Sequence, residues 1–467
     1  MTADDARPDD TGRMRILIIA HHFPPYDHIA SARLGKIAKY MERFGHDVRV
    51  IAARDTLTPF ARMPLEIPAK HVTYTPWINQ IFKADIALNR LVQRVSRRHD
   101  VMEANGPSNL GNQRSGTGAR DSLIEVGKSM RDAIRAVLYF PDAQIGWFPF
   151  GVRAARKLFR SWRPDIIYAS AGPPTALLIA RTLSREYAIP WVGEFRDLWV
   201  ENHRYQHPRW RKKIEDRLER KIVSTASGLV TVSDPLAEAL RRKYDVAVET
   251  VYNGFDPGDH GSGPSGSKAP RLEIRYTGWV YPQQDLAPLF EALQRLGNAA
   301  ESVRVVFYGS DTNLIGQLSR QRGIAHLVET MPAVSFMESL RLQRGGDVLL
   351  YLSWNDTGQT GIFSGKLLQY FGAGRPILAV GNTNNAPARV IQERGLGFAS
   401  SDAREIATRL SQWIAEKHDT TRIEGVPADR ASEFSRENQT RRLESFLART
   451  LARAQRGAGR YIRSPIS

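Results

Sequence analysis

The sequence predicts an α/β protein made of two doubly wound parallel sheets, each sheet in a domain of its own. Short, mostly apolar strand patterns alternate with amphipathic helix patterns, which is typical of parallel sheets covered on both faces. A Gly-, Ser- and Pro-rich stretch, residues 256–270, divides this alternation into two halves and predicts a flexible linker. The length of 467 residues also exceeds what one compact core usually accommodates.

In the first half, the opening strand is MRILIIA, and its continuous apolar run after Arg15 predicts burial on both faces of a sheet. Gly45 ends the helix that follows, and the strand DVRVIA comes directly after it. In chain order we expect strand 14–20, helix 31–44, strands 47–52 and 165–169, helix 176–187, and strands 190–194 and 228–232.

The second half repeats the same alternation. In chain order we expect strand 272–276, helix 286–296, and strands 303–308, 347–352 and 376–380. Parallel sheets of this kind bind ligands beyond the carboxyl ends of their strands. We therefore expect the ligand site in a cleft between the two domains.

The predicted domain boundaries follow from these elements. Residues 1–13 are polar and lack the basic and apolar segments of a signal peptide, so we expect a disordered leader. The first domain spans 14–255 and carries an insertion at 78–140, and the second domain spans 271–430. Residues 431–467 are expected to form a helix that crosses back onto the first domain, followed by a basic tail.

The composition restricts partners and location. The formal net charge of +17 favours nucleic acid, anionic lipid or phosphorylated substrates, although an arginine-rich composition is also common in bacterial enzymes without such a role. The chain has no cysteine, which excludes disulfides and thiolate metal sites and fits a cytoplasmic enzyme. No apolar run approaches the roughly 20 residues that a membrane-spanning helix needs.

Residues 78–99 place apolar side chains at helical spacing, with Lys83 and several arginines among them. A basic amphipathic helix of this kind can lie in a membrane interface, which would place the protein peripherally on the inner face of the cell membrane. The same stripe can instead pack on the core of the first domain. The sequence leaves both alternatives open.

The segment 356–378, DTGQTGIFSGKLLQYFGAGRPIL, predicts a seat for a phosphate or diphosphate. Ser364 is a candidate N-cap, Gly365 lets the backbone approach a ligand closely, and Lys366 adds a full positive charge. The first amides of a helix have no intrahelical acceptor, and the helix dipole adds positive charge there. The alternative is an ordinary capped helix with a solvated lysine.

Several other chemistries lack their motifs. No Asp-x-Asp occurs, so the ligands of the usual metal-bridged diphosphate site are missing. The GIFSGKL segment departs from the P-loop pattern, because its first glycine is one residue too close and Leu367 replaces the magnesium-binding Ser or Thr. No third ligand accompanies His21 and His22 at metal-site spacing, and no nucleic-acid-binding motif occurs. We expect no metal, no cofactor and no nucleic-acid partner.

Five segments in order resemble the retaining glycosyltransferases of family 4, which have the two-domain GT-B fold. The resemblance extends from about residue 14 to residue 417, and a further segment, FPDAQIGWFPFGVRAARKL, resembles a branch that makes bacterial surface polysaccharides. The five segments are FPPYDHIASARLGKIAKYMERFGHDVRVIA, PDIIYASAGPPTALLIARTL with IPWVGEFRDLW, GLVTVSDPLAEAL with VYNGFDP, IRYTGWVYPQQDLAPLFEAL, and FSGKLLQYFGAGRPIL.

The resemblance implies a donor site that departs from the family pattern. Family members usually carry two glutamates eight positions apart, and Gly361 and Gln369 occupy those positions here. A glutamine amide can still bond the nucleotide ribose, although without charge. The family arginine of the TGW segment is replaced by Trp279, so Lys366 and helix amides are expected to neutralise the diphosphate. The expected donor-binding residues are Gly278, Gly309, Gly361, Phe363, Ser364, Gly365, Lys366, Leu367 and Gln369.

The resemblance also implies residues in the first domain. Arg196 lies at or near the position of a histidine that many relatives use beside the acceptor, so Arg196 could bind phosphate and Asp197 could orient the acceptor hydroxyl. A buried Arg–Asp pair that braces the strand end is the alternative. His28, Ser31 and Arg33 lie where relatives place a loop facing the donor phosphates, and helix N-capping is the alternative for Ser31.

Taken together, these features predict a metal-independent, retaining transfer of a sugar from a UDP- or GDP-sugar to an acceptor hydroxyl. The expected catalytic residues are Lys366, Arg196 and Asp197. A lipid-linked glycan is the expected acceptor, and an anionic membrane surface is an expected partner. A GT-B-shaped nucleotide-sugar epimerase and a non-catalytic nucleotide-sugar binding protein remain as alternatives, the second because both family glutamates are missing.

Overall fold

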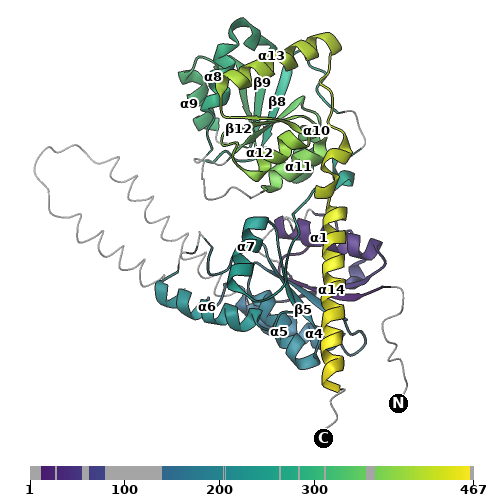
Figure 1. Ribbon diagram of the computed structural model, residues 1–467. Helices are drawn as coiled ribbons and strands as arrows, with labels where there is room; N and C mark the ends of the chain where they lie inside the picture. Colours follow the sequence, from purple (N-terminus) through teal and green to yellow (C-terminus); the bar gives the residue numbers. More distant parts are fainter. Residues whose placement is uncertain are drawn as a thin grey trace, which may run out of the picture. The chain divides into compact units, whose positions relative to one another are not determined.

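The structure of the protein, a computed structural model, describes residues 12–26, 29–54, 63–78, 139–202, 205, 207–261, 265–281, 284–309, 312–353 and 363–462 (Figure 1). The chain forms two compact units. Unit 1 comprises Met1–Thr231, Leu240–Glu249 and Ser445–Ser467, and unit 2 comprises Val232–Ala239 and Thr250–Glu444.

Unit 1 contains a sheet whose described strands follow the order β3-β2-β1-β4-β5-β6-β7, and the neighbours from β3 to β6 run parallel. The order reverses between β1 and β4, which makes this pair the switch point of the sheet. The strands are β1 Arg15–Ala20, β2 Asp47–Ala53, β3 Val72–Thr75, β4 Ile166–Ala171, β5 Trp191–Phe195, β6 Gly228–Thr231 and β7 Val248–Thr250. The helices are α1 Ile29–Arg43, α4 Phe148–Leu158, α5 Thr175–Tyr187 and α6 Arg209–Val223, with short turns η1 Ala69–His71 and η2 Ile145–Trp147.

The sheet of unit 1 is buried on both faces. Leu17 and Ile19 of β1 pack in one cluster with Leu177 of α5. Ile16 and Ile18, whose side chains point to the opposite face, are also fully buried. Burial on both sides explains why the strand patterns of this half are apolar without alternation.

Unit 2 repeats the arrangement with the strand order β10-β9-β8-β11-β12-β13, all neighbours parallel. The strands are β8 Leu272–Thr277, β9 Val303–Tyr308, β10 Val328–Met331, β11 Val348–Leu352, β12 Ile377–Val380 and β13 Gly397–Ser400. The helices are α8 Ala287–Arg295, α9 Thr312–Gln321, α10 Phe336–Arg344, α11 Gly365–Ala373, α12 Ala386–Glu393 and α13 Ala403–Thr420. Short turns are η3 Pro257–His260, η4 Gly297–Ser302, η5 Ala325–Leu327 and η6 Ala428–Phe434.

Two clusters of side chains form the core of unit 2, one on each face of its sheet. Leu350 of β11 packs in one cluster with Phe290 of α8 and Trp413 of α13. The neighbouring Leu349 points to the other face and packs with Leu368 of α11. The unit is therefore doubly wound, with helices on both faces.

Two helices contribute residues to both units, α7 (Asp234–Lys243) and α14 (Arg436–Ile462). Within unit 1, the part of α14 from Ser445 onward packs on β6: a Cβ atom on Gly228 would lie 2.7 Å from the ring of Phe446. Among the helices of the described residues, none combines the length and the apolar character that crossing a membrane requires.

The predicted fold class, α/β with two doubly wound parallel sheets, is confirmed. Strand 303–308 begins and ends at the predicted residues, and the other predicted strands and helices differ by only one or two residues at an end. The predicted leader 1–13 is described only from Gly12 on, and the predicted helix 78–99 lies outside the described residues after Ile78, as does most of the insertion 78–140.

The stretch 256–270, predicted as a flexible linker, packs on unit 2 in its described parts. Asp256 caps the turn η3, and Ser267 is 6% exposed. The N–H of Ser267 donates to Asp347 Oδ1 at 3.1 Å, and its carbonyl accepts from Lys417 Nζ at 2.7 Å. The buried Asp347–Lys417 pair, which the local composition cannot reveal, therefore holds this segment in place.

Candidate functional site

Unit 2 brings two of the predicted donor residues together at the carboxyl ends of its strands. Gly278 directly follows β8, and Gly309 directly follows β9. Both have positive φ angles, 108° and 84°, which L side chains rarely adopt. A Cβ atom on Gly309 would lie 3.9 Å from the Cα of Gly278, so the two turns touch. Because β8 borders β11 at the point where the strand order reverses, the turns lie where such sheets bind ligands.

The amino end of α11 is capped as predicted. Ser364 adopts extended backbone angles, and its Oγ accepts the N–H of Leu367 at 3.2 Å. The N–H groups of Gly365 and Lys366 belong to the first turn and have no intrahelical acceptor. Together with the helix dipole, they can hold an anion.

The side chain of Lys366 extends from this helix end over Tyr276, near the carboxyl end of β8. Its Nζ lies 3.4 Å from the centroid of the Tyr276 ring, a cation–π contact. A Cβ atom on Gly278 would lie 3.3 Å from the same Nζ, so glycine leaves room for the lysine. Burial lowers the pKa of Lys366 to about 7. A negatively charged ligand at this position would favour the protonated lysine again.

Gln369 is held from behind by a second glutamine. Gln343 of α10 is fully buried, and its Nε2 donates to Thr277 Oγ1 at 2.9 Å and to Gln369 Oε1 at 3.3 Å. The N–H of Thr277 donates to Tyr370 Oη at 3.2 Å, which fixes the same turn from α11. The side-chain oxygen of Gln369 is thus engaged within unit 2, and its amide nitrogen is the group left to donate to a ligand.

Sequence reasoning missed Tyr276 and Gln343. Tyr276 is one apolar position among others in the strand LEIRYT, and Gln343 is one polar position in the helix FMESLRLQR. Neither belongs to a motif, and each reaches the site only through the packing of β8, α10 and α11. No local signal in the sequence could have identified them.

Two predicted donor residues contribute to the core instead. Leu367 is fully buried in the cluster under α11, and its N–H is taken by the N-cap serine, so it offers neither side chain nor amide to a ligand. Phe363 is 8% exposed and packs edge-on against Tyr252 at 5.2 Å between ring centroids. Both side chains therefore help to anchor α11, and their contact with a donor stays a prediction.

The loop after β8 presents two aromatic side chains. Tyr276 Oη donates to the carbonyl of Trp279 at 2.6 Å, and the N–H of Tyr281 donates to Gln284 Oε1 at 3.0 Å. The loop is thereby held in place while Trp279 is 56% exposed and Tyr281 is 42% exposed. Exposed rings close to the anion-binding amino end of α11 can stack on the face of a base or a sugar.

In unit 1, Arg33 belongs to a buried charge network. Its Nε donates to Glu194 Oε1 at 2.7 Å, and the two side chains are 2% and 0% exposed. Tyr168 Oη and Ser170 Oγ each donate to the same carboxylate at 2.5 Å. Burial by itself raises the pKa of Glu194, but the charges of Arg33 and Arg196 and the two hydroxyls outweigh it and lower that pKa overall. The guanidinium of Arg33 thus compensates a buried carboxylate, and its predicted contact with a donor phosphate stays a prediction.

Ser31 lies inside α1, which begins at Ile29, so the alternative of N-capping by Ser31 is wrong. The side chain is fully buried, and its hydroxyl has no hydrogen-bond partner among the described residues. Its contact with a donor phosphate stays a prediction. His28, in the same predicted loop, and Gly361, at the first family glutamate position, lie outside the described residues.

Arg196 follows β5 and braces the end of β4. Its Nε donates to the carbonyl of Ala171 at 3.2 Å, and its Nη2 donates to the carbonyl of Gly172 at 2.9 Å. Burial lowers the pKa of Arg196, although Glu194 acts against this shift. Asp197 is exposed, so a buried Arg–Asp pair is not what fixes this strand end. The catalytic roles of both residues stay predictions.

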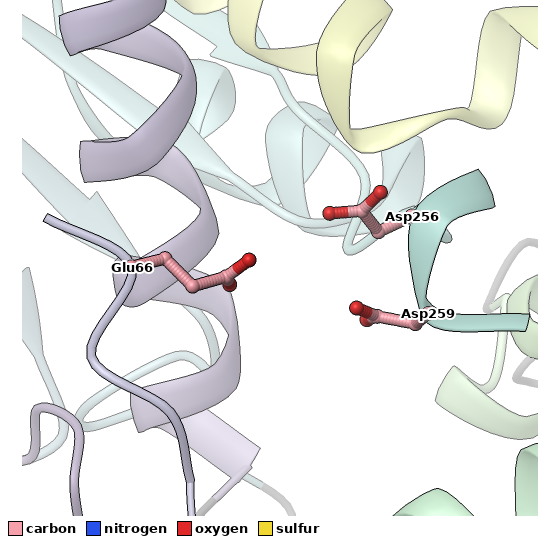
Figure 2. A group of neighbouring side chains, drawn as sticks. All are labelled: Glu66, Asp256 and Asp259. Carbon is pink, nitrogen blue, oxygen red and sulfur yellow. The ribbon is translucent and has the colours of Figure 1, made fainter. Parts of the chain in front are cut away.

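Three carboxylates, Glu66, Asp256 and Asp259, are drawn in Figure 2. Glu66 belongs to unit 1, where it pairs with Lys36 Nζ at 2.8 Å and Lys39 Nζ at 2.6 Å. Asp256 and Asp259 belong to unit 2, and Asp256 Oδ1 accepts the N–H of Gly258 to cap η3. Glu66 and Asp256 thus have structural partners in their own units.

Comparison with known proteins shows a match to one family model over part of the chain and a similar fold over nearly all of it. Residues 117–259 match the family model described as Glycosyltransferase Family 4. No curated protein matches the chain in sequence. These residues include β4, α5, β5 and α6 of unit 1.

Three solved structures illustrate the similarity in fold. The Anabaena protein Alr3699/HepE in complex with UDP aligns with a TM-score of 0.55 at 14% identity, over 93% of this chain and 100% of that one. A glycosyltransferase from Rickettsia africae ESF-5 aligns at 0.51 and 12% identity, over 94% and 99%. The catalytic domain of starch synthase IV from Arabidopsis thaliana, bound to ADP and acarbose, aligns at 0.51 and 12% identity, over 94% and 100%. The family model supports the resemblance to family 4 over residues 117–259, and the predicted GT-B fold with two Rossmann-like domains is confirmed.

Proposed function

From a chain that matches glycosyltransferase family 4 and has the GT-B fold, we propose a retaining glycosyltransferase that moves a sugar from a nucleotide-diphosphate sugar to an acceptor hydroxyl. One observation supports this most strongly: Gly278, Gly309 and the capped helix end with Lys366 meet at the switch point of unit 2. A diphosphate can bind where glycines let it approach the backbone and where free amides and a cation offset its charge.

For the donor we propose a UDP-sugar first and a GDP-sugar second. The similar Anabaena protein was crystallised with UDP and with UDP-glucose, which supports uracil as the base to test first. The diphosphate would lie against the amino end of α11, within reach of Lys366. The Gln369 amide would donate to the ribose or to a neighbouring acceptor, in place of the carboxylate that relatives use.

The mechanism that we propose needs no metal ion. The bond between the anomeric carbon and the diphosphate oxygen breaks, and the acceptor oxygen forms its bond to that carbon on the same face. The departing phosphate oxygen takes the proton of the acceptor hydroxyl, so no separate base is required. Protonated Lys366 and the first amides of α11 would stabilise the negative charge of the leaving group, because such fixed charges are effective in a site that excludes water.

For the acceptor we propose a lipid-linked glycan in polysaccharide biosynthesis, used at the inner face of the cell membrane. The net charge of +17 and the basic amphipathic pattern of residues 78–99 support an anionic membrane surface as a partner. Arg196 and Asp197 are the candidates for the acceptor side in unit 1.

Incubation with radiolabelled UDP- and GDP-sugars and a membrane lipid extract tests this function. Transfer of the label into the lipid fraction, together with release of the nucleoside diphosphate, is expected. Release of nucleotide with a rearranged sugar and no need for lipid would instead identify an epimerase. Binding without turnover of any donor would identify a non-catalytic nucleotide-sugar binding protein.

The affinity for the donor is expected to fall as the pH rises through about 7. Burial lowers the pKa of Lys366 in the free protein to about 7, and the bound diphosphate raises that pKa. Below this pH the lysine is already charged and affinity is highest. Above it, binding must take up a proton, which weakens affinity by up to about tenfold per pH unit. Titration calorimetry with UDP-glucose between about pH 6 and pH 9 measures the effect.

The variant Lys366→Arg is the control for this pH dependence, because a guanidinium stays charged throughout the range. Its donor affinity, whatever its absolute value, should not change between the ends of the pH range. An unchanged affinity in the parent protein, or the same decline in the arginine variant, would show that another group titrates.

Replacing Gln343 with leucine is expected to raise the KM for the donor about tenfold with little change in kcat, because the Gln369 amide loses the bond that orients it. Stability should change little, since the substitution also removes a buried Oε1 that lacks a partner among the described residues. The matched control is Gln294→Leu, which removes an exposed amide bond to the Arg322 carbonyl far along α8. An equal rise in KM in both variants would remove Gln343 from the site.

A further inference from the structure

Helix α6 of unit 1 has the reverse of the usual distribution of side chains. It buries Arg211, Glu215 and Glu219, each 1% exposed. On its other side, Trp210 is 48% exposed and Ile214 is 44% exposed. A surface helix normally turns its apolar stripe to the core and its charges to water. In α6, carboxylates occupy much of the core-facing side and large apolar groups face outward.

Glu215 fixes the rotation of the helix near its start. Its carboxylate accepts from Arg211 Nε at 2.5 Å, from Trp199 Nε1 at 3.1 Å and from Tyr205 Oη at 3.0 Å. The Nη2 of Arg211 donates in turn to the carbonyl of Pro141 at 3.1 Å. A buried carboxylate with these partners cannot turn outward without leaving Arg211 buried and uncompensated.

Glu219 fixes the same rotation one turn later. Its carboxylate accepts from Tyr244 Oη at 2.6 Å, from the N–H of Val200 at 3.2 Å and from Lys243 Nζ at 3.3 Å. Turning α6 to bury Trp210 and Ile214 would therefore break two buried networks. The packing of unit 1 therefore keeps these two side chains exposed.

The exposed side of α6 combines apolar bulk with positive charge. Trp210, Ile214, Arg217 and Lys221 follow one another at helical spacing along a single stripe. The acid nearest this stripe, Asp216, is paired with Arg220 and Lys243. The exposed residues that we call the outer face of α6 are Arg209, Trp210, Lys213, Ile214, Arg217, Arg220 and Lys221.

We propose that the outer face of α6 docks unit 1 onto an anionic lipid surface. An indole ring and an isoleucine can enter the headgroup region, where tryptophan is favoured because one end of its ring is apolar and the other polar. The surrounding lysines and arginines keep their charged ends at the level of the lipid phosphates. Within unit 1, α6 packs beside α5 (Figure 1).

This inference deepens the proposed lipid-linked acceptor, because it names the surface that would hold the enzyme at its substrate. Its test needs neither donor nor acceptor, so a failed transfer assay and a failed docking assay remain distinguishable. A membrane fits this face better than a nucleic acid does, because the apolar side chains of Trp210 and Ile214 can be buried among lipids, whereas contacts with nucleic-acid phosphates use only the basic residues.

Co-sedimentation of the full chain with vesicles of phosphatidylcholine and phosphatidylglycerol, mixed at roughly 7:3, tests the proposal. The parent protein should bind these vesicles and bind pure phosphatidylcholine much more weakly. The double variant Trp210→Ser/Ile214→Ser should lose about tenfold or more in affinity through lost apolar contact. The double variant Arg217→Glu/Lys221→Glu should lose at least as much on the charged vesicles.

The matched control reverses two exposed charges four residues apart on α4 of the same unit, Arg153→Glu/Lys157→Glu. Binding should remain within about twofold of the parent for this control. Quenching of tryptophan fluorescence by brominated lipid should fall in the conservative single variant Trp210→Phe, which keeps an apolar ring. The far-UV circular dichroism spectrum and the urea midpoint should be unchanged in every variant, which confirms that the chain is folded.

Absence of binding by the parent protein would overturn the proposal. Equal loss of binding in the α4 control would also overturn it, because it would show attraction by net charge alone. Unchanged binding after loss of Trp210 and Ile214 would also overturn it, because the membrane contact would then lie in another part of the chain.

Discussion

Replacing Lys366 with alanine is expected to lower the turnover number of sugar transfer by a factor of about 10² or more. Among the described residues at the capped amino end of α11, Lys366 is the one with a positively charged side chain. When the bond to the diphosphate breaks, negative charge grows where the amides and this ammonium are already in place. Loss of a fixed charge of this kind acts on the transition state more than on substrate binding.

A second variant separates charge from packing. Lys366→Met keeps an aliphatic chain over the Tyr276 ring but removes the charge, so its turnover should fall about as far as that of the alanine variant. Lys268→Ala, at an exposed lysine of the same unit, should leave turnover unchanged. Steady-state release of the nucleoside diphosphate gives both kcat and KM. Near-normal turnover in Lys366→Met would assign the leaving-group role elsewhere.

Replacing Glu194 with alanine is expected to destabilise unit 1 by about 3–5 kcal/mol. The carboxylate is fully buried and accepts from Arg33, Tyr168 and Ser170. Its removal leaves the Arg33 guanidinium, 2% exposed, without its counter-ion. Urea denaturation followed by circular dichroism should show the transition of unit 1 at a clearly lower midpoint.

Two comparisons identify the cause of that loss. The double variant Arg33→Leu/Glu194→Leu should be less destabilised than Glu194→Ala, because it removes both charges together. Glu186→Ala, which breaks the exposed pair with Arg156 on the same unit, should leave the midpoint unchanged. A double variant as unstable as the single one would show that cavity formation, rather than the stranded charge, dominates.

The pH dependence of this stability has a definite sign. Burial raises the pKa of Glu194, but Arg33 and its other partners lower it overall, so the folded-state pKa lies below the unfolded one. The contribution is therefore complete at neutral pH, above the unfolded pKa. It declines as the pH falls toward and through the lowered folded-state pKa.

Much of the fold could be predicted because the central strands are buried on both faces. That requirement leaves an unbroken apolar run such as ILIIA in β1 or VLLYL in β11, which is visible in the sequence without any alignment. The capped end of α11 could be predicted for a similar reason, since Ser364, Gly365 and Lys366 are adjacent and their roles are local.

The rest of the site depends on contacts between distant segments. Arg33 and Glu194 are 161 positions apart, and nothing near Arg33 in the sequence distinguishes a buried ion pair from a phosphate ligand. Gln343 reaches Gln369 only because α10 and α11 pack together. In α6, periodicity alone would place Trp210 and Ile214 inward, and the partners of Glu215 and Glu219 reveal the opposite rotation.

The turn at Gly278 restricts the order in which this site could have been assembled during evolution. A larger residue there would strain a backbone with φ of 108°, and its Cβ would lie 3.2 Å from Cε of Lys366. A lineage that first replaced this glycine would have found a lysine at 366 unfavourable. The two positions are therefore expected to show epistasis: the effect of a mutation at one should depend on the residue present at the other.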